Sequence, residues 1–354
     1  MNKCRLVEQG FKQGSCLVFY KSKELYTSNF LKDTACRVTL KQKNNTIYRL
    51  IKSAHLSRPE HYFSIYQSGC NLTCKKCHSW EFTQYANGKW LSPDDIAELV
   101  RNYNTTYKNV MYKESKEYAT SFHAQRLCKS CGFCITTGKR SEYCPNKLEV
   151  EQIVLSPQGF GPARNIIAFT GGDISCQPEF YTQSAEKIKQ IDGDLLVLFE
   201  TNGYGLTPKN LDLFKKAGID AFWLDIKAYD NDVHKELTGV ENDWILKLPG
   251  EILDRNFTLE VLSLYIPGLV EEDQIVKIAQ LLSDVDKTIP FTVLAFFPEY
   301  KLMHIPPPNL EQMLSVYDAI KKSGLKNIRL GNLGQFIKTK EDYEILVNHA
   351  GDAI

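Results

Sequence analysis

From Asn165 onward the sequence alternates short apolar runs with amphipathic segments, and no other feature restricts the fold as strongly. Short apolar runs between polar turns are typical of strands that are buried on both faces of a parallel sheet. The runs occupy residues 166–169, 195–199, 221–226, 257–264 and 291–297. Repetition of strand, helix and strand predicts a parallel α/β sheet.

Helix signals occur in the segments between these runs. Thr207 and Pro208 precede an amphipathic segment that Gly218 ends, and Asn309 with Gln312 begins another. A hydroxyl or amide side chain before the first turn accepts hydrogen bonds from free backbone amides, and a glycine ends a helix readily. These signals place a helix after each predicted strand.

One strand and one helix are predicted ahead of this region. Residues 62–66 form a further apolar run, and Ser92-Pro93 begins the helix behind it. The total is about six strand-helix units, fewer than a closed (β/α)8 barrel contains. The predicted fold is therefore an α/β partial barrel, (β/α)6 and TIM-like.

Two parts of the chain lie outside this repetition. Residues 1–60 are expected to form a small β-rich N-terminal appendage, and residues 104–164 an insertion built around a metal site. Strands within the appendage are predicted at 16–20, 37–40 and 46–51. The resulting division is 1–60, then a barrel of 61–103 and 165–335 interrupted by 104–164, then a C-terminal tail of 336–354.

Composition narrows the class of protein. The 354 residues are 43% hydrophobic and 24% charged, which allows one large domain with a substantial core. No apolar signal region follows Met1, and no stretch is long enough to span a membrane, so we expect a cytoplasmic protein. A net charge of +1 argues against a strong electrostatic hold on nucleic acid.

The chain has 11 cysteines, and most of them fall into two tight groups with metal-ligand spacing. A secreted disulfide framework would spread its cysteines more evenly, and closely grouped thiolates indicate a reducing compartment. Four cysteines stand apart, and we expect them to be buried free thiols: Cys4, Cys16, Cys36 and Cys176.

The first group is Cys70, Cys74 and Cys77, with the spacing C-x3-C-x2-C directly after a predicted strand. Three thiolates this close can each bind one iron of a four-iron cluster and leave the fourth iron without a protein ligand. The alternative is a structural zinc site that His78 completes.

Later motifs follow in the order expected for a known family. Residues 171–173 (Gly-Gly-Asp), 200–203 (Glu-Thr-Asn-Gly) and 225–227 (Asp-Ile-Lys) end the second, third and fourth predicted strands. With the first cysteine group, they resemble the radical S-adenosylmethionine (SAM) superfamily. The second and third motifs are similar to those of the glycyl-radical-enzyme activating enzymes, such as pyruvate formate-lyase activating enzyme.

A further likeness lies near the C-terminus. Residues 297–302 (Phe-Pro-Glu-Tyr-Lys-Leu), three prolines at 306–308 and residues 329–332 (Arg-Leu-Gly-Asn) resemble the radical SAM proteins of the AmmeMemoRadiSam system. The whole resemblance covers about residues 60 to 335. It implies a partial TIM-like radical SAM barrel and an oxidoreductase that works under anaerobic conditions.

The resemblance also implies roles for single residues. The first cysteine group would hold a [4Fe-4S] cluster, and SAM at its open iron would be cleaved to a 5′-deoxyadenosyl radical. Gly171, Gly172 and Asp173 would bind the amino group of SAM. The SAM site would also include Glu200, Thr201 and Asn202, while Asp225 and Lys227 would contact the carboxylate or ribose; the alternative for this last pair is a structural ion pair.

Two positions depart from the family pattern. Most members have an aromatic residue before the third cysteine, near the adenine of SAM, where this chain has Lys76. Adenine would then rest on His78 or Trp80. Many activating enzymes carry an arginine on the fifth strand, where this chain has Leu262.

The second cysteine group is Cys128, Cys131 and Cys134, followed by Cys144 before a proline. This spacing is typical of ferredoxins, and four thiolates predict one closed auxiliary [4Fe-4S] cluster. A structural zinc site is the alternative. A closed cluster would relay electrons or pin the insertion, whereas an iron left free by Cys144 would bind substrate.

The expected function is hydrogen abstraction from a residue of a partner protein, with reduced flavodoxin or ferredoxin as the electron donor. Radical modification of a small molecule, a peptide or tRNA is a second hypothesis, because substrate groups lie on variable loops. An electron-transfer or zinc-stabilised scaffold is the hypothesis without catalysis.

Overall fold

The computed structural model describes residues 4–21 and 30–354, and its centre is a ten-stranded sheet. The strand order is β14-β13-β12-β11-β10-β9-β5-β4-β3, and β6 pairs with β4. All neighbours from β14 to β5 are parallel, whereas β4 is antiparallel to its three partners. The strands of this sheet are β3 (Leu40–Lys43), β4 (Thr46–Leu56), β5 (Phe63–Gln67), β6 (Lys89–Leu91), β9 (Ile166–Gly171), β10 (Leu196–Thr201), β11 (Ala221–Asp225), β12 (Thr258–Tyr265), β13 (Phe291–Ala295) and β14 (Ile328–Gly331).

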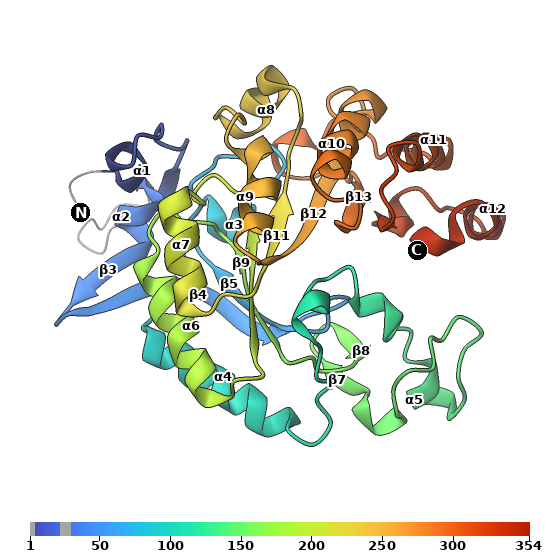
Figure 1. Ribbon diagram of the computed structural model, residues 1–354, viewed down its shortest axis with the longest axis horizontal. Coiled ribbons are helices and arrows are strands. Elements are labelled where there is room, and N and C mark those ends of the chain that lie inside the picture. Colours follow the sequence, from blue (N-terminus) through green and yellow to red (C-terminus); the bar gives the residue numbers. More distant parts are fainter. Residues whose placement is uncertain (1–3, 22–29) are drawn as a thin grey trace.

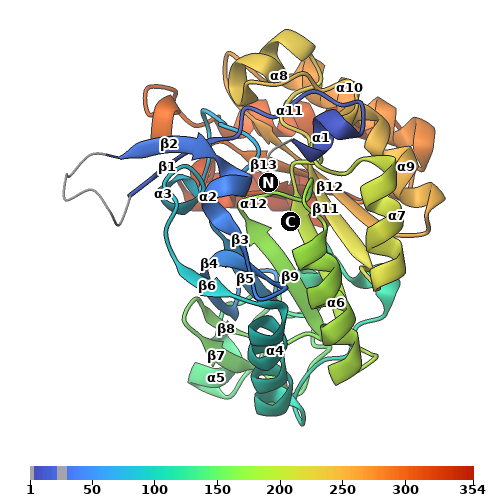
Figure 2. The same cartoon turned by 90° about the vertical axis from the view of Figure 1, so that its left-hand side faces the viewer.

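Helices cover the sheet in the order in which they follow their strands (Figures 1 and 2). Among the longer helices, α4 packs against α6, and α6 packs against α7. Further along the chain, α10 packs against α11, and α11 packs against α12. The helices are α1 (Arg5–Glu8), α2 (Ala35–Thr39), α3 (Trp80–Thr83), α4 (Pro93–Tyr107), α5 (Phe133–Thr137), α6 (Glu179–Ile191), α7 (Pro208–Ala217), α8 (Asn231–Thr238), α9 (Leu248–Asp254), α10 (Glu272–Val285), α11 (Leu310–Lys321) and α12 (Lys340–Ala350). The sheet is not closed, which confirms the predicted partial α/β barrel.

Both faces of the parallel strands are buried, as their continuous apolar runs require. On β10, Val197 and Phe199 belong to the main core, which also contains Phe214 of α7. The opposite face of β10 places Leu196 and Leu198 in a smaller apolar cluster. Polar side chains on that second face therefore lie in the interior of the barrel.

The helix starts follow the predicted capping signals. Ser92 accepts a hydrogen bond from the amide of Asp95, and Thr207 accepts one from Asn210. Asn309 caps α11 in the same way, and Gly218 ends α7 in the left-handed conformation. All six predicted barrel strands are present, while the short β14 was not predicted because its four residues form no long apolar run.

One predicted strand is wrong. Residues 37–40 lie largely in α2, which ends at Thr39, and only Leu40 begins a strand. Ala35 and Thr39 are one helical turn apart and both are buried, so tertiary packing outweighs the strand preference of β-branched residues. The strand predicted at 16–20 is β1 (Leu17–Tyr20), which pairs with β2 (Leu31–Thr34), and 46–51 lies in β4.

The division of the chain at residue 60 stays a prediction, although β3 and β4 extend the central sheet directly. Residues 1–3 and 22–29 of the predicted N-terminal appendage lie outside the described residues. The predicted insertion contains α5 and the hairpin of β7 (Val154–Ser156) and β8 (Gly159–Gly161). Figure 1 shows these elements in the lower right part of the molecule, below α12.

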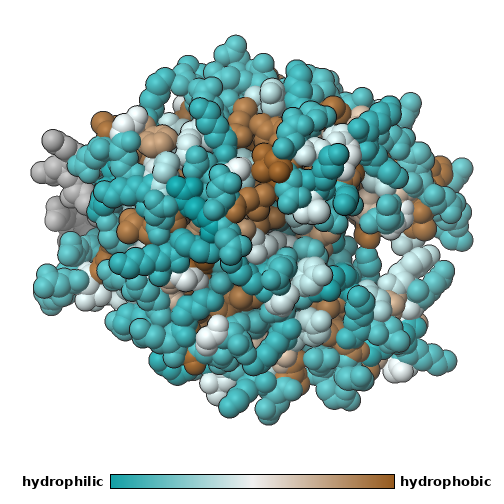
Figure 3. Space-filling model, in the orientation of Figure 1, coloured by the Kyte–Doolittle hydropathy of each residue, from teal (hydrophilic) through white to brown (hydrophobic). Residues whose placement is uncertain are grey.

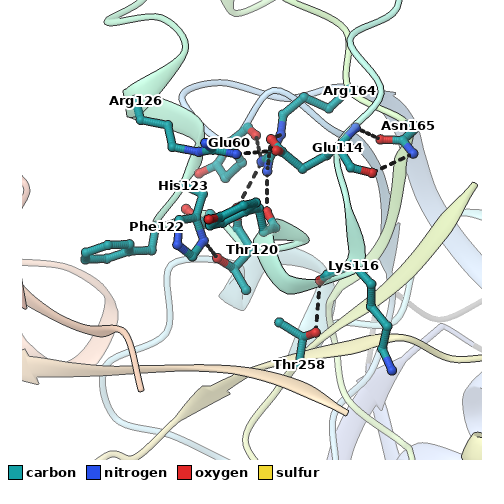
Figure 4. A network of polar contacts seen from close by, with 12 residues as sticks. Glu60, Glu114, Lys116, Thr120, Phe122, His123, Arg126, Arg164, Asn165 and Thr258 are labelled. Carbon is teal, nitrogen blue, oxygen red and sulfur yellow. Dashed lines mark hydrogen bonds and ion pairs between the residues drawn. The ribbon is translucent and has the colours of Figure 1, made fainter. Parts of the chain in front are cut away.

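A buried polar network fastens the start of this insertion to the amino ends of the strands (Figure 4). The Glu114 carboxylate accepts hydrogen bonds from both Nη2 and Nε of Arg164, at 3.0 and 3.2 Å. Arg164 also donates to the carbonyls of Tyr118 and Thr120, at 2.6 and 2.9 Å. Arg126 pairs with the second oxygen of Glu114.

The outer surface carries mostly polar side chains. On the face drawn in Figure 3, hydrophilic side chains predominate and hydrophobic ones appear between them in smaller groups. Within residues 4–21 and 30–354, no helix combines the length and the apolar character that crossing a bilayer requires.

The buried ion pair gives a stability prediction. Replacement of Glu114 by alanine leaves the Arg164 guanidinium, which is 0% exposed, without its carboxylate. We expect a loss of about 3–5 kcal/mol in the free energy of unfolding, measured by urea denaturation. Glu98→Ala, which removes an exposed pair with Arg101, should cost less than about 1 kcal/mol. Equal losses in the two variants would contradict this account.

Candidate functional site

The carboxyl ends of β5, β9, β10 and β11 lie at one edge of the sheet, because these neighbours are parallel and in register. Gln67 at the end of β5 lies opposite Gly171 of β9, and Thr201 of β10 lies opposite Leu224 of β11. Each strand is followed by one of the motifs found in the sequence. The fold therefore brings four separate motifs to one place, the edge where barrel sites assemble.

The loop after β5 carries the first cysteine group. Cys70 and Cys74 are buried, and they share a small apolar cluster with Leu72 and Val240, against which Cys77 packs. Backbone hydrogen bonds hold this loop from several sides: Asn71 N donates to Asp173 O at 2.7 Å, and Lys75 N to Leu237 O of α8 at 2.7 Å. The three thiols thus occupy one well-supported loop.

Burial raises the pKa of all three thiols. For Cys70 it raises the pKa to about 12, and the nearby Asp173 acts in the same direction. The Lys227 ammonium acts to lower the pKa of Cys74 and Cys77, but burial outweighs it. A cation within this group of sulfurs would favour their thiolate forms.

Gly171 and Gly172 bring the end of β9 close to the cysteine loop. Gly171 has a φ of +87°, a conformation that glycine adopts without strain. A Cβ atom on Gly172 would lie 2.2 Å from the carbonyl oxygen of Gly69. The second glycine therefore allows two backbones to pass each other at a distance that no side chain permits.

Asp173 joins this loop to the end of β10. Its Oδ2 accepts hydrogen bonds from the Thr201 hydroxyl at 2.6 Å and from the backbone amide of Asn202 at 3.1 Å. The Asn202 side chain donates to Asn71 Oδ1 at 2.8 Å and to the sulfur of Cys70 at 3.5 Å. Asp173, Thr201 and Asn202 therefore form one continuous network with the first cysteine group.

Glu200 points to the interior face of the barrel, on the same side of β10 as Leu196 and Leu198. Its carboxyl accepts hydrogen bonds from the hydroxyls of Tyr62 and Thr170. Burial raises the pKa of Glu200 to about 8, with a further contribution from Glu60. The group is therefore largely protonated at neutral pH.

Asp225 and Lys227, at the end of β11, form an ion pair. Burial acts to lower the pKa of Lys227, but Asp225 and the Cys74 thiol outweigh it, so the pKa is raised. One oxygen of this carboxylate, Asp225 Oδ1, is buried and accepts no hydrogen bond from any residue that the structure describes. A buried acceptor without a donor is costly, so this atom is suited to a ligand.

Lys76 is buried by the loop after β13, whose role the sequence did not indicate. Its ammonium lies 2.9 Å from Glu299 Oε2 and 3.3 Å from the centre of the Phe297 ring. The amide of Lys301 donates to the Lys75 carbonyl at 3.2 Å, so this loop also pairs with the cysteine loop through its backbone. The only signal in the sequence was the pattern at 297–302. Leu262, at the other departure from the family pattern, is buried in β12.

His78 and Trp80 lie beside the same loop. The His78 ring nitrogen Nδ1 is 3.1 Å from Glu299 Oε2, and the side chain is 80% exposed. The Trp80 ring stacks on Tyr300, with ring centres 5.2 Å apart. One face of the Trp80 ring is therefore already covered by protein.

The second cysteine group lines a cavity of about 20 Å³ within the insertion. Its lining includes all four predicted ligands, Cys128, Cys131, Cys134 and Cys144. Gly132, with a φ of +66°, turns the chain between the second and third of them. The cysteines that sequence spacing grouped are thus brought together by the fold.

The two cysteine groups lie at opposite ends of β5. The Cys128 carbonyl lies 3.2 Å from Nε2 of His61, which precedes this strand, whereas Cys70 follows it. A strand of this length spans roughly 15 Å. In Figure 1 the insertion lies below the sheet, while α8, which supports the first cysteine loop, lies above it.

Comparison with known proteins agrees with these motifs. The family model described as Radical SAM superfamily matches residues 128–282, a range that contains the motifs after β9, β10 and β11. A 4-hydroxyphenylacetate decarboxylase activating enzyme of Clostridium scatologenes is 36% identical over 199 residues, which are 52% of this chain and 60% of that protein. A pyruvate formate-lyase-activating enzyme of Staphylococcus epidermidis is 26% identical over 176 residues, 45% of this chain and 68% of that protein.

A Methanocaldococcus jannaschii protein provisionally named as a glycyl-radical enzyme activating enzyme is 29% identical over 160 residues, 44% of this chain. The chain spans 59% of the length of this relative. Among solved structures, Streptococcus suis SuiB bound to precursor peptide SuiA superposes with a TM-score of 0.50 at 14% identity, over 77% of this chain and 49% of that one. The resemblance to the radical SAM superfamily and to the activating enzymes is confirmed. The structural match shows the fold.

The close backbone approach at Gly172 gives a prediction. In Gly172→Ala, the new Cβ meets the backbone oxygens of Gly69 and Gln67, which cannot move without shifting the cysteine loop. We expect a loss of about 1–3 kcal/mol in the free energy of unfolding, measured by urea denaturation. Gly250→Ala, in α9, should be neutral or stabilising, because beyond its chain neighbours and its own helix backbone no described atom lies within 4 Å of the new Cβ. A neutral Gly172→Ala variant would contradict the proposed crowding.

Glu200 gives a prediction of pH dependence. Its pKa is about 8 in the folded chain against an ordinary value of 4.5, so the folded state holds the proton more tightly. This contribution is fully present below about pH 4.5 and is lost as the pH rises through about 8. Between pH 6 and 8, the wild type should therefore lose up to about 1.4 kcal/mol per pH unit relative to Glu200→Gln.

The measurement is urea unfolding of both proteins across this pH range. Other titrating groups are common to the two chains, so the difference between their curves isolates Glu200. Glu311→Gln, at an exposed position, is the matched control and should follow the wild type. Parallel curves for wild type and Glu200→Gln would show that the carboxyl is already ionised in the fold.

Proposed function

We propose that this chain is a radical SAM enzyme of the activating-enzyme type, in which Cys70, Cys74 and Cys77 hold a [4Fe-4S] cluster. The observation that carries this proposal is the position of the cysteine loop. It lies at the carboxyl edge of the parallel sheet, in direct hydrogen-bond contact with the motifs after β9 and β10. Three thiols in one loop leave one iron of a cubane open to a small ligand.

The residues at this site fit such a cluster. Cys70 and Cys74 are buried in an apolar cluster against which Cys77 packs, and Lys227 places a positive charge near Cys74 and Cys77. In the described part of the chain, no three His, Cys, Asp or Glu side chains are arranged around a single ion. A cubane instead takes one thiolate on each of several irons, whose ligands stand further apart than those of one ion.

The remaining motif residues would bind the cosubstrate. The loop of Gly171 and Gly172 presents backbone groups without side chains beside the cysteines, which suits the amino end of SAM. The ion pair of Asp225 and Lys227 supplies a free carboxylate oxygen and a cation next to the thiols. Asp173 and Asn202 link the glycine loop to the end of β10, and Asn202 links β10 to the cysteine loop.

When bound, the cluster supplies the electron that cleaves SAM and yields a 5′-deoxyadenosyl radical. We propose that this radical takes hydrogen from a residue of a partner protein. The relatives named as activating enzymes support this class of substrate. Modification of a small molecule, a peptide or tRNA is the alternative that a partner assay must separate.

We propose that Cys128, Cys131, Cys134 and Cys144 hold a second, closed [4Fe-4S] cluster. The convergence of all four on the lining of one small cavity supports this assignment. Their place at the opposite end of β5 supports a role as electron relay or structural pin, because a substrate bound there would be a strand length away from the first group. Reduced flavodoxin or ferredoxin is the proposed electron donor.

The two groups should respond differently to mutation. Serine at any one of Cys70, Cys74 or Cys77 should reduce 5′-deoxyadenosine formation with dithionite to background, because the cluster that carries the open iron is lost. Cys128→Ser is the matched control and should lose the second cluster while SAM cleavage survives at least partly. Products are measured by liquid chromatography after anaerobic reconstitution.

Iron content gives the independent readout. Wild type should bind about eight irons per chain, and variants of either group about four. SAM cleavage in a Cys70, Cys74 and Cys77 triple variant would overturn the proposal. For the substrate, a glycyl-radical protein from the same organism should gain a glycyl radical signal in electron paramagnetic resonance, and small-molecule turnover without it would favour the alternative.

A further inference from the structure

Two cysteines outside both groups meet in the folded chain. Cys36 lies in α2 and Cys176 lies in the loop after β9, yet their sulfur atoms are 3.9 Å apart. Neither one takes part in the two cysteine groups described above. The sequence indicated isolated thiols at these positions, because 140 residues separate them.

Neighbouring groups favour one thiolate in this pair. The pKa of Cys36 is lowered, first by a hydrogen bond from Cys176 and further by the Arg49 guanidinium, although burial opposes the shift. The pKa of Cys176 is raised by the same hydrogen bond and by burial. Cys36 is partly exposed, whereas Cys176 is only 4% exposed. A sulfur that its neighbours favour as the thiolate thus stands beside a second thiol.

Arg49 connects this pair to the candidate site. The guanidinium is fully buried, and it donates to the carbonyls of Gly69 at 3.1 Å and Gly172 at 3.2 Å. It also lies 3.4 Å from the carbonyl of Thr39, at the end of the helix that carries Cys36. One buried atom of this side chain, Nε, has no hydrogen-bond partner among residues 4–21 and 30–354. A movement of α2 would therefore reach both loops of the site.

We propose that Cys36 and Cys176 form a redox-active dithiol, a modification site that a low-molecular-weight disulfide converts to an intramolecular disulfide. The Cys36 thiolate attacks one sulfur of the reagent, whose S–S bond breaks and releases one thiolate. Cys176 then attacks the Cys36 sulfur of this mixed disulfide and releases the second thiol. Two electrons pass from the protein to the reagent, and the two protons end on the released thiols.

Closure of this disulfide displaces the loop that follows Asp173. A disulfide bond is about 2.05 Å long, so the two sulfurs must approach by nearly half their present separation. Cys176 is three residues beyond Asp173, and the amide of Ser175 donates to the carboxylate of Asp173 at 2.7 Å. Oxidation therefore acts on the residue that joins the glycine loop to β10. This coupling rests on the proposed function, whereas the disulfide does not.

The test uses the full-length protein, reconstituted under anaerobic conditions and incubated with glutathione disulfide. Free thiols are alkylated, and the digest is analysed by mass spectrometry. We expect a cross-linked pair of peptides that contains Cys36 and Cys176 and that dithiothreitol separates again. Cys176→Ser should trap glutathione on Cys36, while Cys36→Ser should leave Cys176 alkylated and free of glutathione.

Cys16→Ser is the matched control, because the Cys16 carbonyl accepts a hydrogen bond from Ala35 at the start of the same helix. This variant should form the cross-link as the wild type does. Separately alkylated Cys36 and Cys176 at every glutathione ratio would overturn the proposal. A cross-link from Cys36 to Cys16 or Cys4 would also overturn it.

The second measurement is calorimetric binding of S-adenosylhomocysteine. Oxidised wild type should bind this ligand several-fold more weakly than reduced wild type, and Cys36→Ser should bind it equally under both conditions. Unchanged affinity after cross-linking would refute the coupling to the site. Absence of binding to the reduced protein would count against the proposed function and leave the dithiol result standing.

Discussion

Asp173 joins three loops of the candidate site, and the geometry of the site depends on it. Its carbonyl accepts a hydrogen bond from the cysteine loop, and its carboxylate accepts bonds from the end of β10. The two preceding glycines bring its backbone against Gly69, where a side chain would not fit. A charged acceptor with several donors is strongly held, so Asp173 couples the positions of these loops.

The opposite end of the barrel is closed by the start of the insertion. Ala119 packs with Tyr62 in the interior cluster, and the amide of Phe122 donates to Glu260 of β12 at 2.8 Å. Arg329 of β14 donates to the carbonyl of Ser121 at 3.3 Å. Because this end is filled by protein, the edge that carries Cys70 is the one that remains available to a ligand. Both the buried network of Figure 4 and the second cysteine group thus belong to the closed end.

Much of this arrangement could be predicted from the sequence, since parallel strands and helix caps depend on local patterns. The motifs at the strand ends could be placed at one edge because parallel strands share a direction. Contacts between distant segments left no such pattern. Neither Cys36 beside Cys176 nor Glu299 beside Lys76 could be foreseen, because each pair is set by how loops cross in the fold. Helix α2 was missed for the same reason, since burial of Ala35 and Thr39 decides its conformation.

Lys76 shows how a change at one position alters the surroundings of a site. A lysine whose side chain is only 9% exposed requires a counter-charge, which Glu299 supplies, and the Phe297 ring adds a cation–π contact. Both partners come from the loop after β13, so the charge at Lys76 fastens that loop to the cysteine loop. The same loop supplies Phe297, which lies under the Lys76 ammonium, and Tyr300, on which Trp80 of α3 stacks. Aromatic rings are thus gathered around the contact between these two loops, although no aromatic residue directly precedes the third cysteine in the sequence.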